Sequence, residues 1–384
     1  MRVLYISEVQ WLSQISRKHQ MVCRFPDDWA TLFLSPANAT TKENSFVVRS
    51  DESLPHVRYR SLPLPKPDST IPVVRALTPA LGSVGYRAVL SSARGFRPDI
   101  VVCSYIWAAP IIPDLKRLGF PVVYDCNDLH PQFYPSCPET AEGMFRAAVG
   151  AVNEVIASSE RLRAVCGRGV VVGNGVDLTI FGGRIEAPLP EKIATSALSR
   201  CTDLVAYVGS VDERIDFAVL EELLRALAAD HPDVGVICVG RVFARAEARV
   251  AELTAKYPRR VLFTGRVPYE NLPSYLSHAS VGIAPFVLND KTAAINPNKL
   301  YMYAAMDQNI VSTPFSEDVR EYADLIYLAS GPKAFASDVK QALGDDERRR
   351  AVRERIATPN SWDEKAKAFR TVLVRVASSR GSVD

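Results

Sequence analysis

The feature that most constrains the fold is a repeated succession of short apolar runs separated by stretches long enough for a helix. Such runs are typical of strands buried on both faces of a parallel sheet, and a helix between them completes a β-α-β unit. The sequence therefore predicts an α/β fold with doubly wound sheets. In the first half we expect strands at residues 3–6, 30–34, 45–49, 56–60, 99–104, 121–125, 155–158 and 169–172, with helices over 13–23 and 139–149.

The second half repeats this pattern after a stretch rich in Gly, Pro and small polar residues, 182–199. Because single cores seldom grow beyond about 250–300 residues, a chain of 384 residues predicts more than one domain. We expect domains at 1–182 and 203–357, and a C-terminal helical segment, 358–384, that packs on the first domain. The expected strands of the second half are 204–208, 235–239, 261–264, 281–286 and 309–313, with a helix near 220–227.

Composition excludes several classes of protein. Lys and Arg number 46 against 43 Asp and Glu, without a basic stripe, which argues against a nucleic-acid partner. The seven cysteines form no CxxC pair and the five histidines form no HExxH motif, so we predict no metal site. The N-terminus lacks the apolar core of a signal peptide, and no run reaches the ~18 apolar residues of a membrane span. We therefore expect a cytoplasmic protein.

Residues 73–94 leave two interpretations open. Apolar residues alternate there with Arg75, Arg87 and Arg94. This pattern is typical of a helix packed on the core by one face. It also fits a basic, apolar face that contacts the inner surface of a membrane or a lipid-linked acceptor.

Three expected strands of the second half end in glycine followed by a polar residue. The pairs are Gly209-Ser210, Gly240-Arg241 and Gly265-Arg266. Ligands of open α/β sheets bind at the carboxyl ends of the strands, where glycines let backbone N–H groups approach a phosphate. Three such ends predict a nucleotide site.

A short helix with a lysine in its first turn follows the strand at 281–286. Asn296 suits the N-cap and Pro297 the first helical position, which places Asn298 and Lys299 in the first turn. The positive end of a helix disfavours a cation unless an anion is bound there. The alternatives are a solvated surface lysine and a lysine that binds phosphate.

Several of these stretches together resemble GT-B glycosyltransferases. The motif Asn174-Gly175-Val176-Asp177 with Phe181 resembles the signature that closes their first domain. Residues 263–276, 279–286 and 296–306 resemble their C-terminal segments, and 13–19, with Arg17 and His19, resemble the start of one branch. That branch is family-4-like, contains glycosyltransferases of teichuronic-acid type, and is distantly related to the xanthan glucuronosyltransferase.

The resemblance implies a GT-B fold, in which two Rossmann-like domains face a cleft, the second binding a nucleotide-sugar and the first the acceptor. It implies a donor substrate but no further cofactor and no metal, because cations at the diphosphate stabilise the leaving group. The donor-binding residues implied by motif are Ser210, Arg214, Arg241, Gly265, Arg266, Val267, Asn298, Lys299 and Met302.

Two positions depart from the family pattern. Met302 stands where relatives carry a glutamate, and Ala294 stands where retaining relatives carry a second one. The retaining pair is therefore missing, which favours an inverting transfer that needs a general base.

The base is expected after the strand at 121–125, in the stretch from Tyr124 to His130. We favour Asp128, with His130 as the second candidate; a loop cap and a structural histidine are the alternatives. Residues that follow other strands of the first domain are expected to line the acceptor site: Glu8, Trp11, Tyr105 and Trp107. Core packing is the alternative for Tyr105 and Trp107.

The sequence thus predicts a metal-independent, hexosyltransferase-type glycosyltransferase. It would move a sugar from a nucleotide-diphosphate donor, with uridine or a similar base, to a hydroxyl acceptor. The acceptor would be a polysaccharide intermediate, a glycolipid or a secondary metabolite. The alternatives are a non-catalytic partner subunit and a nucleotide-sugar epimerase or phosphorylase on the same scaffold.

Overall fold

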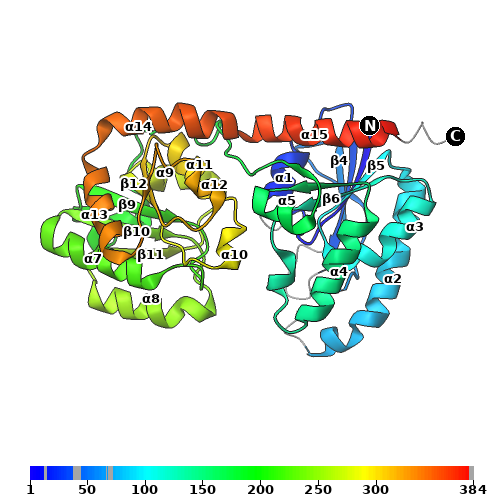
Figure 1. Ribbon diagram of the computed structural model, residues 1–384, viewed down its shortest axis with the longest axis horizontal. Helices are drawn as coiled ribbons and strands as arrows, with labels where there is room; N and C mark the ends of the chain where they lie inside the picture. The colour runs from blue at the N-terminus through cyan, green and yellow to red at the C-terminus, as the bar shows by residue number, and fades with distance from the viewer. Residues whose placement is uncertain (13–14, 38–44, 66, 68–71, 380–384) are drawn as a thin grey trace. The chain divides into compact units, whose positions relative to one another are not determined.

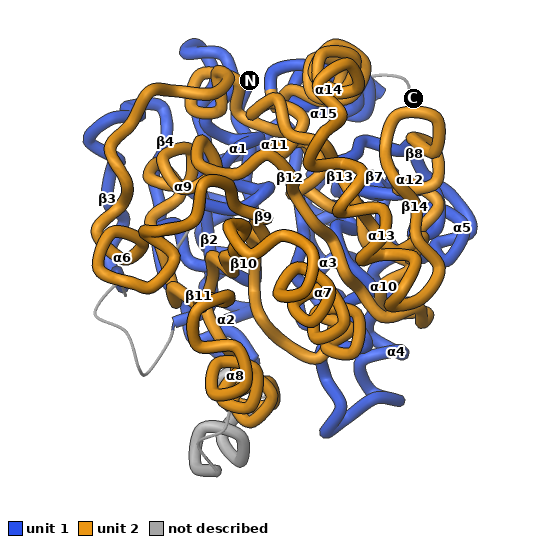
Figure 2. The backbone as a smooth tube through the Cα atoms, turned by 90° about the vertical axis from the view of Figure 1, so that its left-hand side faces the viewer, with its two compact units in different colours: residues 1–173, 363–384 blue, residues 174–362 orange. Residues whose placement is uncertain are grey.

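The computed structural model describes residues 1–12, 15–37, 45–65, 67 and 72–379. The chain forms two compact units (Figures 1 and 2). Unit 1 comprises residues 1–173 and 363–384, and unit 2 comprises residues 174–362. Each unit is a largely parallel sheet flanked by helices, which confirms the predicted α/β fold.

Unit 1 is built on an eight-stranded sheet. Its strands in chain order are β1 (Arg2–Ile6), β2 (Ala30–Pro36), β3 (Arg49–Ser50), β4 (Val57–Leu62), β5 (Ile100–Cys103), β6 (Val122–Cys126), β7 (Glu154–Ala157) and β8 (Val170–Val171). Their spatial order is β3-β4-β2-β1-β5-β6-β7-β8, and β3 alone among these strands is antiparallel to its neighbour. The carboxyl ends of β1, β5 and β6 therefore lie side by side.

The helices of unit 1 return the chain between parallel strands, and local signals fix several ends. In α5, the Ser159 side chain accepts from Leu162 N at the N-cap, and Gly167 ends the helix at φ +67°. The helices are α1 (Arg17–Val22), α2 (Pro72–Phe96), η1 (Ile106–Ile111), α3 (Ile112–Arg117), η2 (His130–Phe133), α4 (Pro138–Ala151), α5 (Glu160–Cys166) and α15 (Trp362–Ser378).

Helix α15 carries the end of the chain back to unit 1, as predicted for the C-terminal segment (Figure 1, red). The ring of Phe369 stacks on Phe25 with centroids 6.4 Å apart. Arg375 forms an ion pair at 2.8 Å with Glu154, the first residue of β7, although the two residues are far apart in the sequence. The final helix is thus part of the core of unit 1.

The described side chains of α2 favour core packing. Val89, Ala93 and Phe96 are buried, whereas Arg87 and Arg94 are exposed. This is the pattern of a helix with one face on the core. The side chains of residues 72–81, including Arg75, lie outside the described ones. Among the described helices, none is long and apolar enough to cross a membrane.

Unit 2 is built on a six-stranded parallel sheet. Its strands are β9 (Asp203–Val208), β10 (Val234–Val239), β11 (Val261–Gly265), β12 (Ala279–Ala284), β13 (Asn309–Ser312) and β14 (Tyr327–Leu328). Their spatial order is β11-β10-β9-β12-β13-β14. The direction of the sheet order changes beside β9, since β10 lies on one side of it and β12 on the other, and such a point is where ligands of doubly wound sheets bind.

The longest helix of unit 2 has an N-cap side chain: Asp216 accepts from Ala218 N and Val219 N at 3.0 and 3.2 Å. The helical segments are α6 (Glu191–Ala194), η3 (Ala197–Arg200), α7 (Phe217–Asp230), α8 (Ala244–Lys256), η4 (Tyr269–Asn271), α9 (Leu272–Leu276), α10 (Asp290–Ala293), α11 (Asn298–Ala305), α12 (Glu317–Arg320), α13 (Pro332–Leu343), α14 (Asp346–Val352), η5 (Arg353–Ala357) and η6 (Thr358–Asn360).

Two expected boundaries differ from the structure. Residues 174–182 belong to unit 2, because Val176 and Phe181 are fully buried in its core. The expected strand at 45–49 is reduced to Arg49–Ser50, since residues 45–48 form no described strand and Phe46, Val47 and Val48 are exposed.

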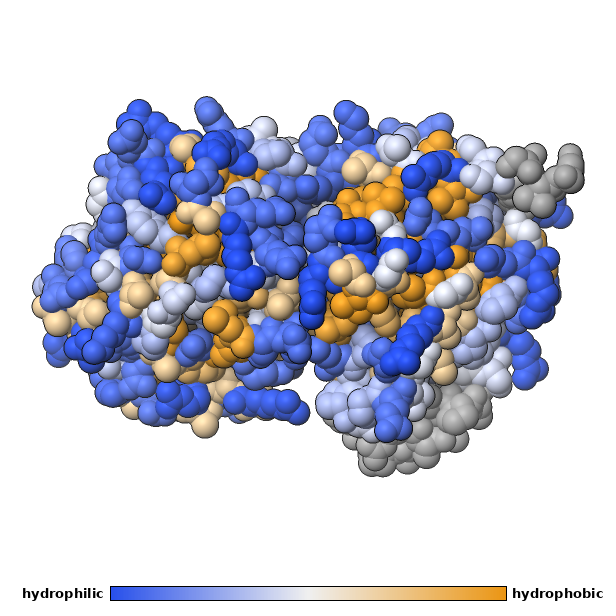
Figure 3. Space-filling view, viewed as in Figure 1, coloured by the Kyte–Doolittle hydropathy of each residue, from blue (hydrophilic) through white to orange (hydrophobic). Residues whose placement is uncertain are grey.

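The surface shown in Figure 3 is mainly hydrophilic, with apolar patches between the charged side chains of both units. Large apolar side chains that are exposed in unit 1 include Leu12, Val84 and Phe133. Scattered exposure of this kind is ordinary for a folded protein.

Candidate functional site

A pocket of about 280 Å³ opens at the carboxyl edge of the unit 1 sheet. Its walls come from the segments that follow β1, β5 and β6 and from the end of β2, as predicted for a doubly wound sheet. The lining residues are Glu8, Pro36, Tyr105, Asp128, His130, Phe133 and Tyr134. Both candidate bases and two of the expected acceptor-site residues therefore share one pocket.

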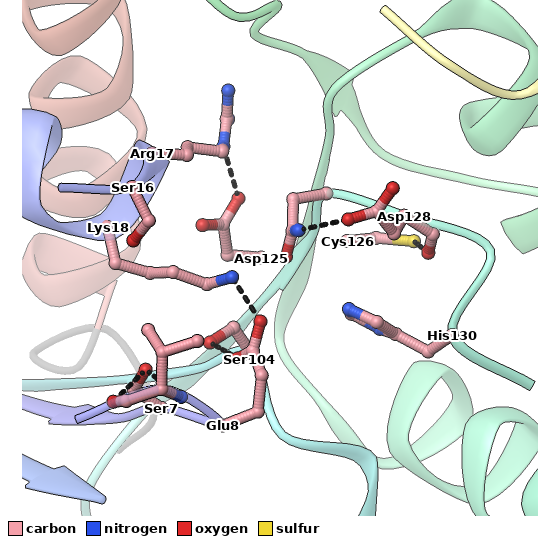
Figure 4. Close-up of polar contacts among 12 residues, drawn as sticks. Ser7, Glu8, Ser16, Arg17, Lys18, Ser104, Asp125, Cys126, Asp128 and His130 are labelled. Atoms are coloured by element: carbon pink, nitrogen blue, oxygen red, sulfur yellow. Dashed lines mark hydrogen bonds and ion pairs between the residues drawn. The ribbon is translucent and has the colours of Figure 1, made fainter. Parts of the chain in front are cut away.

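Glu8 is held as a carboxylate by two neighbours from different elements. Its Oε1 pairs with the buried Lys18 Nζ, and its Oε2 accepts from Ser104 Oγ at 2.7 Å (Figure 4). Burial alone would raise the pKa of Glu8, but Lys18, His130 and the Ser104 hydroxyl together outweigh it and hold the pKa below its usual value. Glu8 therefore brings a fixed negative charge to the pocket.

Asp128 and His130 follow β6 in one short loop. Asn127 Nδ2 donates to Asp128 Oδ2 at 2.8 Å (Figure 4). His130 is 7% exposed, and its Nδ1 lies 2.6 Å from the hydroxyl of Tyr124. Burial lowers the pKa of His130, although the carboxylates of Glu8 and Asp128 act in the opposite direction. The imidazole is therefore neutral near pH 7.

A buried ion pair anchors the strand that precedes this loop. Arg17 Nε lies 3.1 Å from Asp125 Oδ1, and Tyr5 donates to Asp125 Oδ2 at 2.8 Å. The other guanidinium nitrogens of Arg17 donate to the carbonyls of Val172 and Gly173, each at 2.7 Å. Arg17 thus ties the ends of β6 and β8 together, which fixes the position from which Asp128 projects.

Three expected aromatic residues differ in their surroundings. Tyr105 lines the pocket, and its hydroxyl donates to Pro65 O. Trp107 is buried and packs edge-on against Tyr134 with ring centroids 5.1 Å apart. Trp11 packs 4.9 Å from the His19 ring, and its indole N–H donates to Asp51 at 2.7 Å.

Trp11 and Trp107 therefore lie in the core of unit 1 and are not among the residues that line the pocket. Core packing was the alternative for Trp107, whereas Trp11 was expected at the acceptor site. His19 belongs to the same core. Burial lowers its pKa to about 4, so it is neutral, and its Nε2 lies 2.6 Å from Trp11 O.

The carboxyl edge of the unit 2 sheet holds the three glycines that the sequence singled out. Gly209, Gly240 and Gly265 follow or end the adjacent strands β9, β10 and β11, and each has a positive φ. At Gly240 a Cβ atom would lie 1.9 Å from Gly209 O, so only glycine fits there. The strand ends thus approach one another closely, and Gly209 N and Gly240 N donate to Val239 O and Gly265 O across them.

Lys299 reaches this edge from the first turn of α11. Its Nζ lies 4.0 Å from the Phe286 ring centroid and 5.1 Å from that of Tyr207, and a Cβ on Gly209 would be 3.6 Å from it. Burial, aided by the nearby Arg214, lowers the pKa of Lys299 to about 7. A cation placed beside aromatic rings, without an ion pair of its own among the described residues, is suited to receive an anion.

Arg214 lies near Lys299 but is already paired. Its Nε and Nη2 lie 2.8 and 2.5 Å from the two carboxylate oxygens of Asp212. Ser210 contributes its carbonyl to the hydroxyl of Tyr207 at 2.7 Å. Asp212 therefore holds Arg214 in place at the edge of the sheet.

The remaining expected donor residues lie on the surface of the same edge. Arg241 follows β10 and stacks on Phe243 at 4.7 Å. Arg266 is exposed after β11, and Val267 is partly buried against the core. Asn298 precedes Lys299, and its Oδ1 is buried without a hydrogen-bond partner in the described structure.

The start of α11 corrects one detail of the prediction. The helix begins at Asn298 with Pro297 at its N-cap, not with Asn296 there. The Asn296 side chain instead accepts from Asn174 N at 2.9 Å and donates to Asp318 at 2.7 Å. Asn174 Nδ2 also donates to Asn296 O at 2.8 Å, so the two signature stretches are joined.

Met302, at the position where relatives carry a glutamate, has an apolar side chain that packs in the core of unit 2. Its exposed fraction is 8%. Among the described residues, no group of three or more His, Cys, Asp or Glu side chains is placed to hold a metal ion.

Sequence reasoning missed several neighbours of the candidate residues. Lys18 and Ser104 set the charge state of Glu8, and Tyr124 contacts His130. Lys18 lies between Arg17 and His19 in the N-terminal segment, so its position offered a signal. No sequence pattern indicated Tyr124, because its hydroxyl becomes significant only through the fold.

Comparison with known proteins shows which families the chain resembles. Residues 202–345, within unit 2, match the model of a family described as Glycosyl transferases group 1. Over 289 residues the chain is 24% identical to the putative teichuronic acid biosynthesis glycosyltransferase TuaH of Bacillus subtilis (strain 168), a match that covers 72% of this chain and 66% of TuaH. The chain therefore contains a segment similar to the group 1 glycosyl transferases, and over 72% of its length it is similar to a putative glycosyltransferase of teichuronic acid biosynthesis.

Solved structures share the fold of this chain, which is the GT-B fold. Sucrose-phosphate synthase from Thermosynechococcus elongatus superposes with a TM-score of 0.76 at 18% identity, covering 98% of this chain and 99% of that one. Anabaena HepE, in complex with UDP and glucose, gives a TM-score of 0.72 at 14% identity, covering 97% and 99%. The matched region spans just under two thirds of the length of TuaH.

Proposed function

We propose that this protein is a glycosyltransferase that moves a sugar from a nucleotide-diphosphate donor to a hydroxyl acceptor. The observation that carries the proposal is the position of Lys299, which brings a cation to the glycine-rich carboxyl edge of the unit 2 sheet. This is where doubly wound sheets bind nucleotides, and the same unit contains the matched family domain.

The donor would place its diphosphate against Lys299 and the first turn of α11. The helix N-terminus supplies unpaired backbone N–H groups. Gly209 has no side chain, and the Lys299 ammonium lies 3.6 Å from where its Cβ would be. Lys299, with Arg214 beside it, would stabilise the charge that develops on the leaving diphosphate without a metal ion. A uridine nucleotide is the first candidate, because the similar HepE structure holds UDP.

Asp128 is the proposed general base of an inverting transfer. Its carboxylate would take the proton of the acceptor hydroxyl while the oxygen attacks the anomeric carbon. The bond from that carbon to the diphosphate breaks, and the diphosphate leaves as the anion. The pocket in unit 1 holds Asp128 together with Glu8, so both carboxylates can accept hydrogen bonds from sugar hydroxyls.

The part of the acceptor that enters this pocket would be uncharged. No lysine or arginine is among the described residues that line it, and the nearby Lys18 is paired with Glu8. A phosphate or carboxylate would therefore face carboxylates without a free cation. Tyr105, Phe133 and Tyr134 offer aromatic surface for the C–H faces of a sugar ring.

The experiment is a product analysis with UDP-, GDP- and dTDP-sugars. Each donor is incubated with a neutral glycoside, with glucose 6-phosphate or with no acceptor. The proposal expects transfer to the neutral glycoside and slow donor hydrolysis without it. Epimerised donor in the absence of acceptor would show that the protein is an epimerase and not a transferase. Donor binding without any product would favour a non-catalytic partner subunit.

A further inference from the structure

The imidazole of His130 has one satisfied and one unsatisfied nitrogen. Nδ1 lies 2.6 Å from the hydroxyl of Tyr124. Nε2 is buried and has no hydrogen-bond partner among the described residues, although His130 lines the unit 1 pocket. Figure 4 shows His130, Asp128 and Glu8 in the same region of unit 1. Nε2 is therefore the atom of this ring that remains for a ligand.

The direction of the Tyr124 bond follows from the surroundings of its hydroxyl. Tyr124 is fully buried, and within the described structure His130 Nδ1 is its sole hydrogen-bond partner. A buried hydroxyl whose hydrogen finds no acceptor is strongly disfavoured. If Nδ1 were the donor, the hydrogen of Tyr124 would have no acceptor. Tyr124 therefore donates, and Nδ1 accepts.

An imidazole that accepts at Nδ1 and is neutral carries its proton on Nε2. The ring is neutral at physiological pH because burial lowers its pKa. The nitrogen without a partner, in a ring that lines the pocket, is consequently an N–H group, which can donate a hydrogen bond but cannot take a proton.

We infer that Tyr124 holds His130 in the Nε2–H tautomer, and that His130 donates a hydrogen bond to an oxygen of the acceptor. Tyr124 is a positioning residue, and His130 is a binding residue and not the base. This inference rests on the proposed transfer reaction for the identity of the ligand, but not for the tautomer. Both carboxylates in the pocket accept hydrogen bonds, but only Glu8 is also paired with a cation, Lys18, so the proton is assigned to Asp128.

The tautomer can be measured without any substrate. Long-range ¹H–¹⁵N spectra of the intact, ¹⁵N-labelled protein distinguish protonated from unprotonated ring nitrogens, and the signal of His130 is identified by its loss in His130→Gln. We expect a protonated Nε2 and an unprotonated Nδ1. Tyr124→Phe, which removes the donor to Nδ1, should produce a mixture of both tautomers. A protonated Nδ1 in the wild type, or a spectrum unchanged by Tyr124→Phe, would overturn the inference.

A second experiment separates a donor from a base. His130→Gln retains an N–H donor, His130→Glu offers an acceptor, and His130→Ala offers neither. We expect the turnover of the Gln variant to stay within about tenfold of the wild-type turnover. The turnover of the Ala and Glu variants should be at least about tenfold lower than that of the Gln variant. Activity in the His130→Glu variant but not in the His130→Gln variant would show that His130 acts as the base. Thermal unfolding of all three checks that they are folded.

The two experiments fail independently. If no donor or acceptor supports turnover in the wild type, the proposed function is lost while the spectra still decide the tautomer. If the spectra show the Nδ1–H tautomer in an active enzyme, the transfer reaction stands and the role inferred for His130 is wrong.

Discussion

At Lys299 a single ammonium group faces two aromatic rings and the glycine end of a strand, with a pKa lowered to about 7. The sequence marked this residue because a cation in the first turn of a helix opposes the helix dipole. The structure supplies the reason why the position is tolerated, since the ring faces of Phe286 and Tyr207 attract the cation.

The lowered pKa of Lys299 predicts a pH dependence of donor binding. A bound diphosphate favours the charged lysine and raises its pKa, so binding takes up a proton above pH 7. The dissociation constant of UDP should therefore rise with pH above about 7, by up to roughly tenfold per unit. Calorimetry between pH 6.5 and 9 measures it. Lys299→Arg, charged throughout, is the control and should flatten the profile; an equally steep profile in that variant would exclude Lys299 as the titrating group.

Asp128→Asn should abolish transfer while donor binding persists. The amide keeps the size of the carboxylate but cannot take the proton of the acceptor hydroxyl, and loss of a general base costs about 10²–10⁴-fold in rate. Initial rates with saturating donor and acceptor measure the effect, and UDP calorimetry on the same variant gives the control. Turnover within a few-fold of the wild type would remove Asp128 from the mechanism.

The elements of unit 2 are joined by contacts that sequence patterns predict only in part. The strands and the helix at 298–305 lie within a few residues of their expected positions, because buried parallel strands and amphipathic helices leave strong apolar patterns. The N-cap was placed one residue early at Asn296. Local propensity favours asparagine there, but the bonds of Asn296 to Asn174 and Asp318 take precedence.

The packing of α11 on β12 depends on Gly282. A Cβ at this position would lie 2.2 Å from Cγ of Tyr303, whose hydroxyl accepts from Val208 N and donates to Ile283 O. Gly282→Ala must displace that ring, so we expect a loss of at least about 1–3 kcal/mol in the free energy of unfolding. Urea unfolding measures it. Gly344→Ala, where no atom lies within 4 Å of the added methyl group, is the matched control and should change stability far less. Equal stability of the two variants would contradict this account of the packing.

At the scale of the whole molecule, the sequence predicted two α/β units and the return of the last helix to the first unit. The boundary after Gly173 was not predicted, because composition changes at 182–199 while core packing changes earlier, at Val176 and Phe181. A loop-rich composition marks where the chain is irregular, and burial decides to which core it belongs.

The candidate sites, like the domain boundary, could be predicted only in part. Strand ends indicate an edge of a sheet, and the candidates predicted at such ends, Glu8, Tyr105, Asp128 and His130, share one pocket. Whether an aromatic side chain turns into the pocket or into the core depends on long-range packing. Trp11 and Trp107 are buried by Phe33 and Tyr134, which lie far from them in the sequence.

The central claim is that unit 2 binds a nucleotide diphosphate through Lys299. Titration calorimetry of UDP into the wild type and into Lys299→Ala, at pH 6.5 where the lysine is charged, tests it most directly. A charged hydrogen bond to phosphate is worth about 1.5–3 kcal/mol, so the account predicts binding by the wild type and a roughly 10- to 100-fold weaker affinity in the variant. Equal affinities, or no heat with UDP, GDP or dTDP in a folded wild-type protein, would contradict it.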